Sequence, residues 1–141
     1  MTLVIARAAH HDLVAHALRE APLEACGLLL GAGDVADEFI PIRNALRSPV
    51  RYEMEPAEVA AVFRRTLGGP REPVALFHSH PDGDPYPSRT DAEQATMPWL
   101  VYLVLSLSGS EPVLAGFHIS GPGAIAPVSL AIREPVVGTT G

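Results

Sequence analysis

The order in which short apolar runs follow helical segments constrains the fold of this chain more than any other feature. Apolar residues recur at helical spacing in residues 10–20 and 58–67, and Pro56 stands where a first-turn proline belongs. A shorter helix is expected at residues 88–97. Strands are expected at residues 26–31, 35–42, 74–77, 101–107, 113–119 and 125–132. Because neighbouring strands are interspersed with helices, we expect an α/β or α+β fold with a mixed sheet, not a doubly wound parallel one.

Length and charge narrow the class of protein. The 141 residues fit one domain, which we expect at residues 1–134, with a flexible tail at 135–141. No apolar run reaches the roughly 18 residues that span a bilayer, and the run at 2–6 is too short for a secretory leader. A net charge of −6 argues against nucleic-acid binding. We therefore expect a soluble, cytoplasmic protein without a membrane or nucleic-acid partner, and leave open whether it forms a homodimer.

The chemistry is concentrated in one stretch that begins at the end of an expected strand. His78 and His80 stand two residues apart, and alternate side chains of a strand point to the same side. Asp91 follows after a loop rich in proline and glycine, in the first turn of the next helix. Two imidazoles and one carboxylate leave a fourth tetrahedral position for water, as in catalytic zinc sites.

Each part of this pattern has a simpler interpretation when taken alone. Ser88 and Asp91 have the spacing of a helix capping box, and His78 and His80 could be two half-buried imidazoles. The combination favours a metal site. Ser88 can serve both purposes if its backbone starts the helix while its hydroxyl faces the metal.

A catalytic zinc also needs a base for its water. Glu24 immediately precedes the apolar run at residues 26–31 and is a candidate, although an isolated Glu there would be taken for a surface residue. Cys26 is the only cysteine, so no internal disulfide can form, and we expect it to be a small buried residue behind Glu24.

The segments Glu24-Ala-Cys-Gly-Leu-Leu-Leu-Gly31 and His78-Ser-His-Pro followed by Ser88-Arg-Thr-Asp91 resemble the JAMM (MPN+) zinc metalloprotease family. That family has an upstream Glu, then His-x-His-Pro, then Ser-x-x-Asp. The stretches Pro41-Ile-Arg-Asn44 and Tyr52-Glu-Met-Glu-Pro56 are also similar to it, so the resemblance covers residues 22–105. It implies the JAMM/MPN (cytidine-deaminase-like) fold, a central curved mixed sheet flanked by helices.

The resemblance also implies a mechanism. His78, His80 and Asp91 would bind one Zn²⁺ per chain, Glu24 would act as general base, and the Ser88 hydroxyl would stabilise the oxyanion. The substrate would be an amide after the C-terminal Gly-Gly of a ubiquitin-like protein. The short chain is most similar to a bacterial branch that releases cysteine, or another C-terminal amino acid, from a small sulfur-carrier protein in cysteine biosynthesis.

Other functions stay open at this point. They are an isopeptidase that cleaves Lys-linked ubiquitin-like conjugates, a non-catalytic module that holds Gly-Gly tails, and an amidase acting on a small molecule or beside DNA. Asp82 and Asp84 are expected to be solvated and to line the substrate entrance. A basic loop containing Arg43, Arg47 and Arg51 is either solvated or contacts an acidic carrier. Trp99 belongs either to the core or to the edge of the site.

Overall fold

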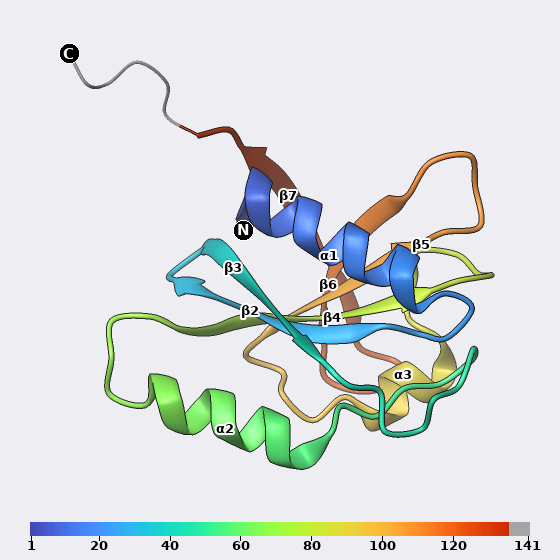
Figure 1. Cartoon of the computed structure of the whole chain (residues 1–141), viewed down its shortest axis with the longest axis horizontal. Helices are drawn as coiled ribbons and strands as arrows, with labels where there is room; N and C mark the ends of the chain where they lie inside the picture. Colours follow the sequence, from blue (N-terminus) through green and yellow to red (C-terminus); the bar gives the residue numbers. More distant parts are fainter. Residues whose placement is uncertain (136–141) are drawn as a thin grey trace.

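The computed structural model describes residues 1–135, and its helices and strands follow the expected order with one addition (Figure 1). The addition is a first strand, which lies in the run at residues 2–6. The elements are β1 (Thr2–Ala6), α1 (Arg7–Glu20), β2 (Cys26–Ala32), β3 (Val35–Ile42), α2 (Pro56–Thr66), β4 (Glu72–His80), α3 (Arg89–Gln94), β5 (Val101–Ser106), β6 (Val113–Ile119) and β7 (Ile125–Arg133). Most of the expected tail, at 136–141, lies outside the described residues.

The strands form one mixed sheet that closes on itself in the order β1-β3-β2-β4-β5-β6-β7. The pairs β2–β3, β2–β4, β5–β6 and β6–β7 are antiparallel, whereas β4–β5, β1–β3 and β1–β7 are parallel. The prediction of a mixed sheet, not a doubly wound parallel one, is confirmed. The parallel pairing of β1 with β7 was not expected, and it turns the curved sheet into a closed one.

The central strands are buried on both sides, which explains their continuous apolar runs. Alternate residues of β2 and β4 enter two separate clusters. Leu29 and Phe77 pack in the cluster that includes Leu13 of α1, whereas Leu28 and Leu76 pack in the cluster that receives side chains of α2 and α3. Figure 1 shows α1 on one side of the sheet and α2 on the other. By the same alternation, His78 and His80 belong to the side of α2 and α3.

Element boundaries differ from the expectation most at β4, which runs over Glu72–His80 instead of 74–77 and so includes both histidines, and at two helices. α1 begins at Arg7, three residues early, because the chain passes directly from β1 into the helix without a side-chain cap. α3 ends at Gln94, three residues before the expected end at residue 97. There the Met97 N–H donates to the Tyr102 hydroxyl at 2.9 Å instead of to a helical carbonyl. Within residues 1–135, none of the helices has the length and apolarity required to cross a bilayer.

Candidate metal centre

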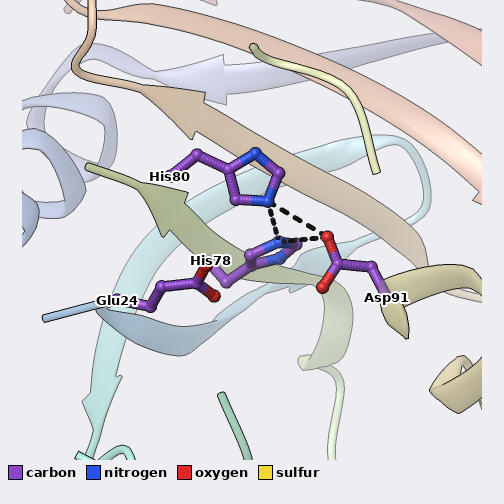
Figure 2. Close-up of side chains that lie close together, drawn as sticks. All are labelled: Glu24, His78, His80 and Asp91. Atoms are coloured by element: carbon purple, nitrogen blue, oxygen red, sulfur yellow. Dashed lines mark hydrogen bonds and ion pairs between the residues drawn. The ribbon is translucent and has the colours of Figure 1, made fainter. Parts of the chain in front are cut away.

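Strand β4 ends in two histidines whose rings meet on one side of the sheet (Figure 2). Their Nε2 atoms lie 3.0 Å apart, and the Asp91 Oδ2 atom lies 3.0 Å from each of them. The two histidines and Asp91 are almost completely buried, with side-chain exposures of 2%, 11% and 8%. The sequence-based prediction that His78, His80 and Asp91 converge therefore agrees with the geometry.

Asp91 reaches the histidines because α3 begins with a capping box. The Asp91 N–H donates to the Ser88 Oγ atom at 3.0 Å, and the Ser88 N–H donates to Asp91 Oδ2 at 2.8 Å. The capping and metal interpretations of this pair are thus compatible. The Asp91 carboxylate both accepts the capping hydrogen bond from the Ser88 N–H and faces the histidines, while Ser88 stays exposed beside it.

Each histidine is oriented by a second contact. The Nδ1 atom of His80 lies 2.7 Å from the Asp84 carbonyl oxygen, which can only accept, so Nδ1 carries a proton and Nε2 is the nitrogen that faces Asp91. The ring of His78 stacks on Tyr52, with 4.3 Å between the ring centroids and an interplanar angle of 17°. Both Nε2 atoms are therefore held towards Asp91.

Burial and mutual contact set the charges of the cluster. Burial lowers the pKa of His78 and so favours its neutral form. Burial also opposes the charging of His80, but contact with the Asp91 carboxylate and the Asp84 carbonyl raises its pKa. Burial alone would raise the pKa of Asp91, yet hydrogen bonding to both histidines moves it well below its usual range. Asp91 is therefore an anion that can serve as a ligand.

Glu24 completes the cluster from the other side of the histidines (Figure 2). One potential ligand atom from each of Glu24, His78, His80 and Asp91 lies within 4.8 Å of the other three. Glu24 is only 4% exposed, and its Oε1 atom is buried without a hydrogen-bond partner among residues 1–135. Burial, aided by the Asp91 charge and opposed by His80, raises the pKa of Glu24 to about 7. A buried carboxylate without a partner is poised to take a proton.

The backbone around Glu24 is held by three segments. The Glu24 N–H donates to the Ser48 carbonyl at 2.8 Å, and the Asn44 side chain donates to the Glu24 carbonyl at 3.0 Å. The next residue, Ala25, donates its N–H to the Ser79 hydroxyl at 2.8 Å. Since Ser79 stands between the two histidines, this bond fixes the distance between the backbone next to Glu24 and the histidines.

Three of these positioning residues were missed by the sequence reasoning. Asn44 is buried and joins Glu24 to the 43–55 loop, because its amide also contacts the backbone of Leu46, Arg51 and Glu53. Ser79 is completely buried, and Tyr52 stacks on His78. For Ser79, the signal was its place between two histidines on a strand. For Asn44 and Tyr52, the signal that could have identified them was their position in two segments, residues 41–44 and 52–56, that resemble the JAMM family.

The remaining sequence-based expectations have mixed outcomes. Cys26 is buried behind Glu24 as expected, and its burial raises the pKa of the thiol to about 12. Trp99 is 67% exposed, so it is not a core residue. Asp82 and Asp84 are exposed in the loop after His80, as expected for solvated acids. Neither acid joins the metal cluster.

The donor set fits a divalent metal ion. Two ligand atoms at normal distance from a tetrahedral zinc ion lie about 3.3 Å apart, close to the 3.0 Å spacing of the three donors. Two imidazoles and an anionic carboxylate form the two-His, one-carboxylate combination of catalytic zinc sites. The group of Glu24, His78, His80 and Asp91 is typical of a JAMM zinc site.

A large hollow adjoins the cluster on the side of Asp91. It has a volume of about 700 Å³, and its wall is mainly apolar, with Tyr52, Met54, Val59, Phe63, Met97 and Tyr102 among the lining residues. Asp91 lines it as well. Its other charged lining residues, Arg51 and Glu53, come from the 43–55 loop. The metal cluster therefore borders an apolar hollow at Asp91.

Comparison with known proteins finds a matching family and similar sequences. Residues 6–116 match the family described as prokaryotic homologs of the JAB domain. A CysO-cysteine peptidase of Mycobacterium tuberculosis is 41% identical over 106 residues, which cover 74% of this chain and 73% of the relative. A desampylase of Haloferax volcanii is 35% identical over 114 residues, covering 76% and 82%.

Solved structures agree on the fold. A protein from Desulfitobacterium hafniense, with 28% identity, superposes with a TM-score of 0.83 over 99% of this chain and 97% of its own. A JAB1/MPN domain protein from Archaeoglobus fulgidus, with 18% identity, superposes with a TM-score of 0.61 over 94% and 98%.

Proposed function

This chain belongs to the family of prokaryotic homologs of the JAB domain and is a JAMM-type metallopeptidase, and from that premise we propose its substrate and its reaction. We propose that it hydrolyses the amide bond after the C-terminal Gly-Gly of a ubiquitin-like sulfur-carrier protein and releases cysteine or another C-terminal amino acid. The observation that carries this proposal is the convergence of a buried, unpartnered Glu24 on His78, His80 and Asp91.

His78, His80 and Asp91 would hold one Zn²⁺ per chain. The fit rests on the neutral His78, the protonated Nδ1 of His80 and the anionic Asp91, because zinc binds imidazole lone pairs and carboxylates. When bound, the ion supplies Lewis acidity to the attacking water and to the scissile carbonyl. Tyr52 and the Asp84 carbonyl keep the two rings in place for this role.

Glu24 is the proposed general base and acid. Its Oε1 atom accepts the proton of the attacking water and later delivers it to the leaving nitrogen. Burial raises the pKa of Glu24, so its carboxylate takes up a proton more readily than an exposed glutamate does. Hydrogen bonds of Asn44, Ser48 and Ser79 with the backbone of Glu24 and Ala25 hold the Glu24 carboxylate in place during this proton transfer.

Ser88 is the proposed donor to the oxyanion. Its Oγ atom already accepts the Asp91 N–H, and this leaves the hydroxyl hydrogen free to donate. The hydroxyl is exposed next to Asp91, on the side where the carbonyl oxygen of a substrate would lie. The carrier tail would reach this point through the large apolar hollow.

The proposed substrate rests on the relatives. The chain is similar to a CysO-cysteine peptidase over almost three quarters of both sequences. A Gly-Gly tail is thin enough to lie extended beside a metal cluster that is almost completely buried. One second candidate is supported, cleavage of Lys-linked ubiquitin-like conjugates, because the Haloferax volcanii desampylase is also similar.

The test is mass spectrometry of the zinc-loaded enzyme with a Gly-Gly carrier that ends in cysteine and with the same carrier joined to a lysine side chain. We expect loss of the single C-terminal residue. Glu24→Gln is expected to retain zinc and to lose about 10²–10⁴-fold in rate. Cleavage of the lysine adduct alone would establish the second candidate instead, and a fully active Glu24→Gln would remove Glu24 from the mechanism.

A further inference from the structure

A second hollow lies between the segments that precede Glu24 and follow His80. Its volume is about 570 Å³, and it is lined by Ala21, Pro22, Pro49, Val50, Pro81 and Asp82. Five of these six residues are apolar, and Asp82 is the only charged one. Val50 is 73% exposed, so it offers apolar surface that a ligand could cover.

Every segment that lines this hollow is attached to the catalytic groups. Pro22 stands two residues before Glu24. Pro49 and Val50 follow Ser48, whose carbonyl accepts the Glu24 N–H at 2.8 Å. Pro81 and Asp82 follow His80 directly. The residues that line this hollow are therefore close in sequence, or hydrogen-bonded through Ser48, to Glu24 and His80, whereas Asp91 itself lines the large hollow.

The reaction gives the Glu24 and Asp91 sides of the cluster different roles. Ser88, which would face the carbonyl oxygen, is bonded to Asp91, whereas Glu24 would deliver the proton to the leaving nitrogen. Figure 2 shows Glu24 and Asp91 on opposite sides of the two histidines. With these roles, the carrier tail would lie on the Asp91 side, and the group bound to the scissile nitrogen would lie on the Glu24 side.

We propose that the hollow formed by Pro22, Pro49, Val50, Pro81 and Asp82 binds the side chain of the residue that is released, and that it selects uncharged or cationic side chains against acidic ones. This inference rests on the proposed function. Three prolines give a rigid apolar wall, because each fixes its backbone angle φ and offers no N–H to a polar group. Asp82 repels a carboxylate, and within the described part of the chain no basic residue lines the hollow to compensate.

The test compares carrier adducts that end in cysteine, leucine, asparagine or aspartate. For the wild type we expect kcat/KM for the Asn adduct to exceed that for the Asp adduct about fivefold, a ratio typical of exposed like charges. Asp82→Asn should bring this ratio to about 1, and Asp82→Arg should invert it. Asp34, at the turn between β2 and β3, provides the matched controls Asp34→Asn and Asp34→Arg, which should keep the wild-type ratio.

The outcomes separate the two claims. An Asn-to-Asp ratio that is the same in the wild type, Asp82→Asn and Asp82→Arg would overturn the assignment of the hollow while the proposed function stands. A ratio that changes equally in the Asp34 controls would show a general charge effect and would also overturn it. Absence of cleavage of all four adducts by the zinc-loaded wild type would overturn the proposed function itself, and the pocket assignment with it.

Discussion

The two halves of the metal centre are built in different ways. His78 and His80 end a strand of the sheet: His78 pairs with Cys26 of β2 and with Val104 of β5, and His80 pairs with Ser106 of β5. Ser88 and Asp91 belong to α3, a six-residue helix whose only buried residue is Ala92. The strand half of the centre, His78 and His80, is preorganised by the core. The helix half, Ser88 and Asp91, depends on a capping box and on the contact of Asp91 with the histidines.

The largest effect is expected from removing a ligand of the strand half. His78→Ala should abolish activity and weaken zinc binding by more than the 10–100-fold typical of outer-shell partners. Asp91→Asn should weaken zinc binding too, but its amide oxygen can still accept the Ser88 N–H, so α3 should persist. Chelator competition and circular dichroism measure both. Unchanged zinc affinity in His78→Ala would contradict the ligand assignment.

The next largest effect is expected on the pH dependence of stability of the metal-free protein, and it comes from buried Glu24. The pKa of Glu24 is raised from 4.5 to about 7, so its contribution to stability is full below pH 4.5 and is lost as the pH rises through 7. This shift corresponds to roughly 3 kcal/mol. Glu24→Gln should therefore gain about that much unfolding free energy relative to the wild type between pH 4.5 and pH 8.5. Urea unfolding of both metal-free proteins tests this, and a pH-independent difference would contradict it.

Ser88 tests whether the helix half combines two roles. Ser88→Ala should lower kcat about 100-fold through loss of the oxyanion donor, and should cost about 1 kcal/mol of stability through loss of the cap. Ser88→Gly should lose the same activity but only a few tenths of a kcal/mol, since glycine is tolerated at N-caps. If activity followed stability across the two variants, the hydroxyl would have only a structural role.

The smallest effect is expected on backbone mobility, when the protein is compared with and without zinc. Without zinc, backbone NMR order parameters at residues 89–94 should fall from about 0.85 towards 0.6, while those of β4 stay near 0.85. The reason is that α3 loses the ligand contact that supplements its single buried residue. Equal loss of order in β4 and α3 would remove the distinction between the two halves.

The sequence predicted the convergence of ligands better than it predicted what holds them. The strand period places His78 and His80 on one side, and the spacing of Ser88 and Asp91 predicts the capping box that the structure contains. Both are local rules. The burial of Glu24 depends on Ser79 and Asn44, which lie 55 and 20 residues away along the chain and act through tertiary hydrogen bonds.

The same limit applies to the fold. Strand β1 escaped prediction because a five-residue run carries little information until it pairs with β7, whose register joins Thr2 to Ser129. The position of α1 followed from its helical spacing, but its start at Arg7 depends on that strand. In each case, the missing information was a contact between distant parts of the chain.

The loop anchored by Asn44 has a consequence for how specificity can change. Leu46 and Arg51 line the large hollow. Pro49 and Val50, which lie between them in sequence, line the second hollow. On the assignment of the two hollows given above, one short segment contacts the groups on both sides of the scissile bond without contributing a ligand or a base. Exchange of residues 45–51 between relatives would therefore change the preferred carrier and the preferred leaving residue in a single evolutionary step. The residues proposed to perform the reaction would stay the same.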